Sequence, residues 1–78
     1  MPNKLVEIEL FIIQRVRDIR ESLNITQEDL SFRLNKNRGF IGDIEAPSKD
    51  AKYNIKTLNE IAKIFGCSPK DFWPDKPL

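Results

Sequence analysis

The stretch from Thr26 to Glu45, TQEDLSFRLNKNRGFIGDIE, constrains the fold of this chain more than any other part of its sequence. Thr26 is a favourable N-cap, and Asp29 follows it at the spacing of a capping box, so a helix is predicted to begin here. Leu30 and Leu34 lie one turn apart and give that helix a buried side. The stretch therefore opens with a short amphipathic helix.

A polar turn and a second helix complete the stretch. Residues 35–37 are Asn-Lys-Asn, and Asn35 is a residue type that tolerates the left-handed conformation. Asn37 is a good N-cap and predicts a second helix over 38–45, with Ile41 and Ile44 on its buried side. Its other side carries Arg38, Gly39, Gly42 and Asp43. Two short helices joined by a three-residue turn form a helix-turn-helix, here with its core at 26–45.

The size of the chain predicts one domain over residues 1–78, because 78 residues bury too little surface for two cores. The 40% hydrophobic and 32% charged residues are typical of a globular protein rather than a disordered one. No apolar run reaches membrane-spanning length, and the N-terminus lacks the pattern of a signal peptide. We therefore expect a cytoplasmic protein with no membrane partner.

The chemistry available to this chain argues against an enzyme. One cysteine and no histidine exclude an internal disulfide and a zinc site of the usual Cys and His type. Neither a histidine base nor a glycine-rich phosphate loop is present, so we expect no catalytic activity, no cofactor and no metal. Cys67 follows a predicted helix, and we interpret it as a core-packing residue rather than a reactive thiol.

Residues 5–23 have the apolar periodicity of a long first helix with one core-facing stripe. The first half of this helix carries a second apolar stripe, rotated by more than a quarter turn, and such a helix must be covered on two sides. The chain's own C-terminal residues Phe72 and Trp73 could cover the second stripe, or a second copy of the protein could. The stripe, a candidate dimer interface, consists of Val6, Leu10 and Ile13.

The rest of the sequence predicts a loop and two further helices. Residues 46–54 are polar and without periodicity, which indicates a loop. Asn54 is an N-cap for a fourth helix that ends at Gly66. Ser68 and Pro69 are typical of the start of a fifth helix, which Phe72 to Pro74 end almost at once. The fold class expected from these elements is all-α.

Particular residues of the motif also resemble those of a known family. Gln27 opens the first motif helix, Leu30-Ser31 stands where that family has Leu-Ala, and residues 40–45 match its aromatic-Ile-Ser-x-Ile-Glu run. The likeness extends to Arg20 and to residues 54–73. The sequence resembles the Cro and phage-repressor type of helix-turn-helix, called the XRE family of transcriptional regulators. The resemblance implies a compact five-helix, lambda-repressor-like DNA-binding domain.

The resemblance also implies a role for individual residues. Arg20 would pair with Glu45 in a structural salt bridge, and Gln27 would donate to a phosphate. The recognition helix, 38–45, would lie in the major groove, where Arg38 suits guanine and Asp43 suits the amino group of cytosine. Tyr53 would either bond to a phosphate or pack below the next helix. The predicted DNA-binding residues are Gln27, Lys36, Asn37, Arg38, Gly39, Gly42, Asp43, Lys49 and Lys52.

The charge distribution agrees with this interpretation better than the net charge of +1 does. Residues 33–56 carry six basic and three acidic side chains, against four and six in residues 1–32. We therefore predict a small transcriptional regulator that binds a specific sequence in double-stranded DNA as a homodimer. The alternative is a module that binds a protein partner, such as the antitoxin of a toxin-antitoxin pair.

Overall fold

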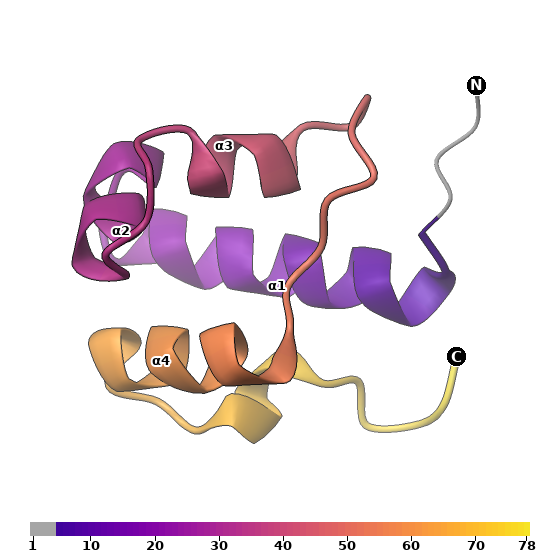
Figure 1. Ribbon diagram of the computed structural model, residues 1–78. Coiled ribbons are helices and arrows are strands. Elements are labelled where there is room, and N and C mark those ends of the chain that lie inside the picture. The colour runs from indigo at the N-terminus through magenta and orange to yellow at the C-terminus, as the bar shows by residue number, and fades with distance from the viewer. Residues whose placement is uncertain (1–4) are drawn as a thin grey trace.

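The computed structural model describes residues 5–78, and that part of the chain forms helices and connecting loops (Figure 1). Four α-helices follow one another, and a short 3-10 turn, η1, comes last. Their bounds are α1 Glu7–Ser22, α2 Gln27–Arg33, α3 Phe40–Glu45, α4 Ile55–Phe65 and η1 Pro69–Phe72. The all-α class predicted from the sequence is confirmed for the described residues.

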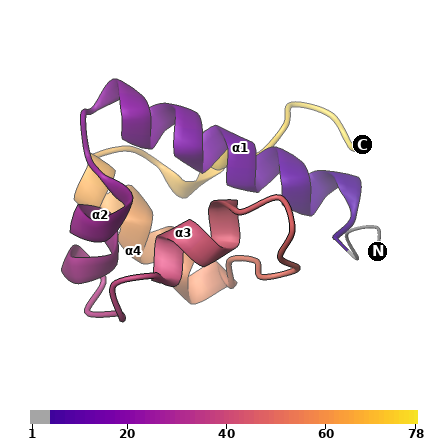
Figure 2. The same cartoon turned by 90° about the horizontal axis from the view of Figure 1, so that it is seen from above.

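The helices pack around α1, the longest of them. In Figure 1, α3 runs along one side of α1 and α4 along the other, while α2 lies at its C-terminal end. Figure 2 shows the same arrangement from above, with α2 and α3 beside each other. This arrangement leaves one side of α3 without a covering helix among the described residues, and Asp43 is an exposed residue of α3.

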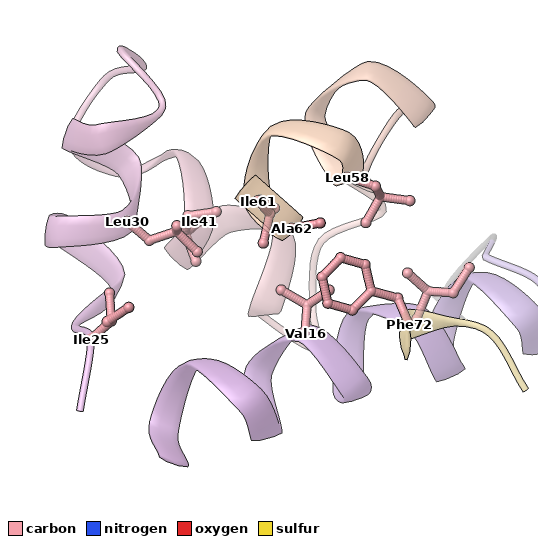
Figure 3. Close-up of a cluster of buried hydrophobic side chains, with 9 residues drawn as sticks. Val16, Ile25, Leu30, Ile41, Leu58, Ile61, Ala62 and Phe72 are labelled. Atoms are coloured by element: carbon pink, nitrogen blue, oxygen red, sulfur yellow. The ribbon is translucent and has the colours of Figure 1, made fainter. Parts of the chain in front are cut away.

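One hydrophobic core joins all of these elements (Figure 3). Every helix contributes to it, because each carries apolar residues at helical spacing on one side. Phe72 of η1 is fully buried and meets the ring of Phe65 edge to face, with 6.2 Å between ring centroids. The core residues labelled in Figure 3 are Val16, Ile25, Leu30, Ile41, Leu58, Ile61, Ala62 and Phe72.

Capping residues fix the starts of α2 and α4 and the end of α4. The Thr26 hydroxyl accepts from the backbone N–H of Asp29 at 3.0 Å, and the Asn54 side chain accepts from Thr57 at 2.7 Å. Gly66 ends α4 in the left-handed conformation, with φ of 72°. Only half of the predicted capping box at α2 forms, since the Asp29 carboxylate pairs with Arg33 at 3.1 Å instead of reaching back.

The prediction of five helices is not confirmed. In place of a fifth α-helix stands η1, a single 3-10 turn of four residues. Ser68 caps it as predicted, but Trp73 is already extended, with ψ of 150°. Trp73 precedes Pro74, and a residue before proline is disfavoured in the helical region, so the turn cannot grow into a longer helix.

The predicted recognition helix, 38–45, begins two residues late, at Phe40. The Asn37 side chain accepts from the backbone N–H of Gly39 at 3.1 Å and so closes a turn rather than capping a helix. The backbone N–H of Phe40 donates to the carbonyl of Asn37, also at 3.1 Å. Arg38 and Gly39 therefore belong to the turn that leads into α3.

The second apolar stripe of α1 is divided by the fold. Val6 and Leu10 remain 58% and 44% exposed, whereas Ile13 is only 9% exposed. Ile13 borders one groove with Tyr53 and another with Ile44, because it lies between α3 and the loop that follows α3. Ile13 is therefore buried within the protein, and the exposed part of the stripe is limited to Val6 and Leu10.

Candidate nucleic-acid interface

A buried ion pair fixes α3 against α1. Arg20 donates to both carboxylate oxygens of Glu45, through Nε at 2.9 Å and through Nη2 at 2.8 Å, and its Nη1 donates to the carbonyl of Ile25 at 2.8 Å. The two charged side chains are only 7% and 1% exposed. Hydrogen bonding to Glu45 raises the pKa of Arg20. The guanidinium binds the carboxylate in a bidentate arrangement with two hydrogen bonds, and this strong pair fixes the position of α3.

Gln27 is drawn into the same network. Its Nε2 donates to Oε1 of Glu45 at 2.8 Å, so at most one of its two amide hydrogens remains for the predicted phosphate contact. Its Oε1 lies beside Gly42, where an added Cβ would come within 3.2 Å of it. Gly42 therefore provides room for the Gln27 side chain to cross α3 and reach Glu45.

Ser31 is a structural residue whose role the sequence did not reveal. Its hydroxyl accepts from the backbone N–H of Ile41, at 3.1 Å, and donates to the carbonyl of Gln27, at 2.9 Å. Its side chain is fully buried between the two motif helices. The serine that replaces the family's alanine at this position thus satisfies a backbone donor at the start of α3.

The outer side of the motif carries two exposed ion pairs. Arg38, with a side chain 86% exposed, bonds through Nε to Glu28 in the first turn of α2. Asp43 lies 4.0 Å from the ammonium group of Lys49 in the following loop. Both charged side chains predicted to enter the groove are therefore already paired within the protein. The sequence did not indicate that Arg38 would pair with Glu28 or Asp43 with Lys49, although Glu28 stands next to Gln27.

The other predicted cations are distributed around this face. Lys36 lies over the ring of Phe40, 5.4 Å from its centroid, in a cation–π arrangement near the start of α3. Lys52 instead bonds to Glu9 of α1 at 2.6 Å, and this bond lowers the pKa of Glu9. The two loop lysines are therefore separated, with Lys49 beside α3 and Lys52 tied to α1.

Tyr53 is partly buried and packs against the hydrophobic core. Its hydroxyl is buried and has no hydrogen-bond partner among residues 5–78. Burial, and then the charge of Glu45, raise the pKa of this hydroxyl above its usual range. Of the two roles considered for Tyr53, the structure favours packing, because the buried oxygen atom is out of reach of a phosphate.

Cys67 and the rest of the described chain carry no sign of a metal site. The Cys67 thiol is half-buried against the core, and burial raises its pKa. Within residues 5–78, no three metal-ligating side chains gather to hold an ion. Over the same residues, none of the helices is both long and apolar enough to cross a bilayer.

Comparison with known proteins gives this arrangement a family. The sequence profile of the helix-turn-helix family matches residues 16–72, which include both motif helices, the buried ion pair and most of the core. The chain belongs to the helix-turn-helix family. This helix-turn-helix protein is also 37% identical over 65 residues to the control protein C.BamHI of Bacillus amyloliquefaciens, an alignment that covers 82% of this chain and 78% of the relative.

Solved structures extend the likeness to three dimensions. A mutant of the restriction-modification controller protein C.Esp1396I is 29% identical, with a TM-score of 0.73 over 92% of this chain and 85% of the other. The controller protein C.AhdI of Aeromonas hydrophila has the same fold at 21% identity, with a TM-score of 0.68 over 80% and 91% of the two chains. The chain is a DNA-binding transcriptional regulator of the Cro and phage-repressor type, and nothing in these similarities favours the antitoxin alternative.

Proposed function

We propose that this regulator is a control protein of a restriction-modification system and that it binds its DNA site as a homodimer. The proposal rests on the contrast between the buried and the exposed residues in and just before α3. Ile41, Ile44 and Glu45 are buried, while the side chains of Asp43 and of Arg38, in the turn before the helix, are 61% and 86% exposed. The likeness to C.BamHI supports the choice of a control protein among the many kinds of regulator.

The outer side of α3 has the chemistry to distinguish base pairs. Arg38 can donate two hydrogen bonds to O6 and N7 of guanine, and Asp43 can accept from the amino group of cytosine. Gly39 has no side chain, so the backbone of the turn before α3 can approach the base edges closely, whereas the space beside Gly42 holds the Gln27 side chain. The remaining predicted contacts, to the phosphates, are those of Gln27, Lys36, Asn37, Lys49 and Lys52.

A second copy of the chain is the natural partner of the exposed part of α1. Val6, Leu10 and Phe11 are 58%, 44% and 37% exposed there, and Leu10 and Phe11 border a groove that reaches Pro47 after α3. One short recognition helix reads only a few base pairs. A two-fold dimer doubles that contact and sets the half-sites about 34 Å apart, one turn of DNA.

Selection of bound duplexes from a random pool, followed by salt titration, tests DNA reading directly. We expect a palindromic consensus that contains guanine. The logarithm of the binding constant should fall linearly with the logarithm of the salt concentration, with a slope of roughly −0.9 for each phosphate contacted. The absence of any enriched sequence, or of any salt-dependent binding to duplex DNA, would contradict the proposal.

Leu10→Glu tests the dimer, and Phe32→Glu is its matched control. Phe32 is a still more exposed apolar residue, at 80%, but it lies on α2, away from the proposed interface. We expect Leu10→Glu to halve the mass in solution and to weaken binding to the palindrome, while the circular dichroism of the folded protein is kept. Phe32→Glu should leave the mass unchanged, and it should alter the affinities for the palindrome and for random duplex by one common factor, because it adds the same charge away from the interface. A dimer that persists with Leu10→Glu would place the interface elsewhere.

A further inference from the structure

Glu28 is an acidic residue in an unexpected place. It lies in the first turn of α2, next to Gln27, at the end of the helix that is predicted to meet a phosphate. Its carboxylate is 58% exposed and pairs with Arg38, the predicted reader of guanine. A carboxylate at this position repels the DNA backbone, so it weakens binding to every sequence alike unless it also acts on Arg38.

The geometry of the pair leaves Arg38 able to read a base while Glu28 holds it. The contact joins Nε of Arg38 to Oε2 of Glu28. A guanidinium has five N–H donors in one plane, and a bond at Nε leaves donors on both terminal nitrogens. These are the atoms that would face O6 and N7 of guanine. Glu28 can therefore orient the guanidinium group of Arg38 without occupying the N–H donors that would bind the base.

The other charges of the outer side are mostly paired as well. Arg38 is balanced by Glu28 and Asp43 by Lys49, so these two pairs cancel, and Lys36 near the start of α3 adds one positive charge. A balanced surface attracts phosphates in general less than an unpaired arginine would, while the directed hydrogen bonds to guanine remain available. The expected effect is a larger difference between the affinities for the chosen and for random sequences.

We infer that Glu28 is a specificity-determining residue, which positions Arg38 for guanine and keeps it from pairing with phosphates of any sequence. The inference rests on the proposed reading of DNA by Arg38. The pair is exposed and therefore weak, so the predicted effect is a modest one. Without Glu28, the protein should prefer the guanine-containing site over a site that lacks this guanine less strongly, by a factor of about 1.5 to 5.

Glu28→Gln tests this inference, with Asp29→Asn as the matched control. Both changes remove one negative charge from the first turn of α2, and both release an arginine, because Asp29 pairs with Arg33 on the same helix at 3.1 Å. Glu28→Gln should bind random duplex about 1.5-fold to fivefold more tightly and lose guanine preference by a similar factor. Asp29→Asn should change the affinities for all duplexes by one common factor and keep the preference.

Making Glu28→Gln in the Arg38→Ala variant distinguishes the positioning of Arg38 from a general effect of the removed charge. In Arg38→Ala, the further change Glu28→Gln should leave the remaining base preference unaltered, since the group that Glu28 positions is gone. The inference is overturned if Glu28→Gln keeps the parental guanine preference, or if Asp29→Asn loses as much of it. A parent protein that shows no salt-dependent binding to duplex DNA would overturn the proposed function itself, a result that the parent alone reveals.

Discussion

Two arginine–glutamate pairs of this domain have opposite surroundings. The side chains of Arg20 and Glu45 are 7% and 1% exposed, and those of Arg38 and Glu28 are 86% and 58% exposed. A buried pair resists separation, because removing one partner leaves the other charged and without water. An exposed pair contributes little to stability, since water solvates either partner when they part. The difference shows which arginine can hold the fold and which can exchange partners for DNA.

The hydrogen bonds around each pair support this contrast. Glu45 accepts from Arg20 and from Gln27, and Arg20 also donates to the carbonyl of Ile25, so the buried pair joins α1, α2 and α3. A single contact with Glu28 links Arg38 to α2. Stability should therefore depend on Glu45, and base preference on Arg38.

Glu45→Ala is the change expected to have the largest effect. It leaves the Arg20 guanidinium buried without its partner and should lower the free energy of unfolding by about 3 to 5 kcal/mol. Urea titration followed by circular dichroism measures this loss. Glu28→Ala is the matched control, with an expected loss of less than about 1 kcal/mol. Equal losses for the two variants would show that burial does not separate the two pairs.

Arg38→Ala should affect DNA binding and leave stability almost unchanged. Its loss should reduce discrimination at one guanine by about 1 to 3 kcal/mol, measured as the ratio of affinities for the selected site and its single-base variants. Lys36→Ala, a control on the same exposed turn, should weaken all of these duplexes alike, because phosphate contacts carry no base information. A uniform loss for Arg38→Ala would instead place Arg38 among the phosphate contacts.

Tyr53→Phe gives the smallest effect at neutral pH and tests the surroundings of the buried pair. The Tyr53 hydroxyl is buried without a partner among the described residues, so its removal should change the free energy of unfolding by no more than about 1 kcal/mol, in the stabilising direction. Loss of more stability than this would mean that the hydroxyl makes a hydrogen bond, for example to an ordered water.

The same variant should differ from the parent in alkaline solution. Because burial raises the pKa of Tyr53, the folded protein holds the phenol proton more tightly than the unfolded chain does. The stability linked to this proton is complete below about pH 10, the usual pKa of tyrosine, and is lost as the pH rises further. Tyr53→Phe should therefore lose less stability than the parent above that pH. Tyr53 is the single tyrosine in the sequence, so phenolate absorbance reports its titration directly.

The sequence allowed the positions of helices to be predicted better than the contacts of the site. Thr26, Asn54 and Gly66 act on their own backbone neighbourhood, so their capping roles could be read from residue type and spacing. The start of α3 was misplaced because Asn37 can close a turn as well as cap a helix. The partners of Arg38 and Asp43 depend on how long side chains cross between elements, which local sequence does not determine.

The alternation of buried and exposed positions along α3 has a consequence for evolution. Ile41, Ile44 and Glu45 hold the helix in place, while positions 38, 39 and 43 are exposed. Substitutions at exposed positions usually alter stability by no more than about 0.5 kcal/mol, so the outer positions can mutate while the domain stays folded. A descendant of this chain could acquire a new DNA target sequence through a few substitutions at these positions, and the protein would stay folded after each one.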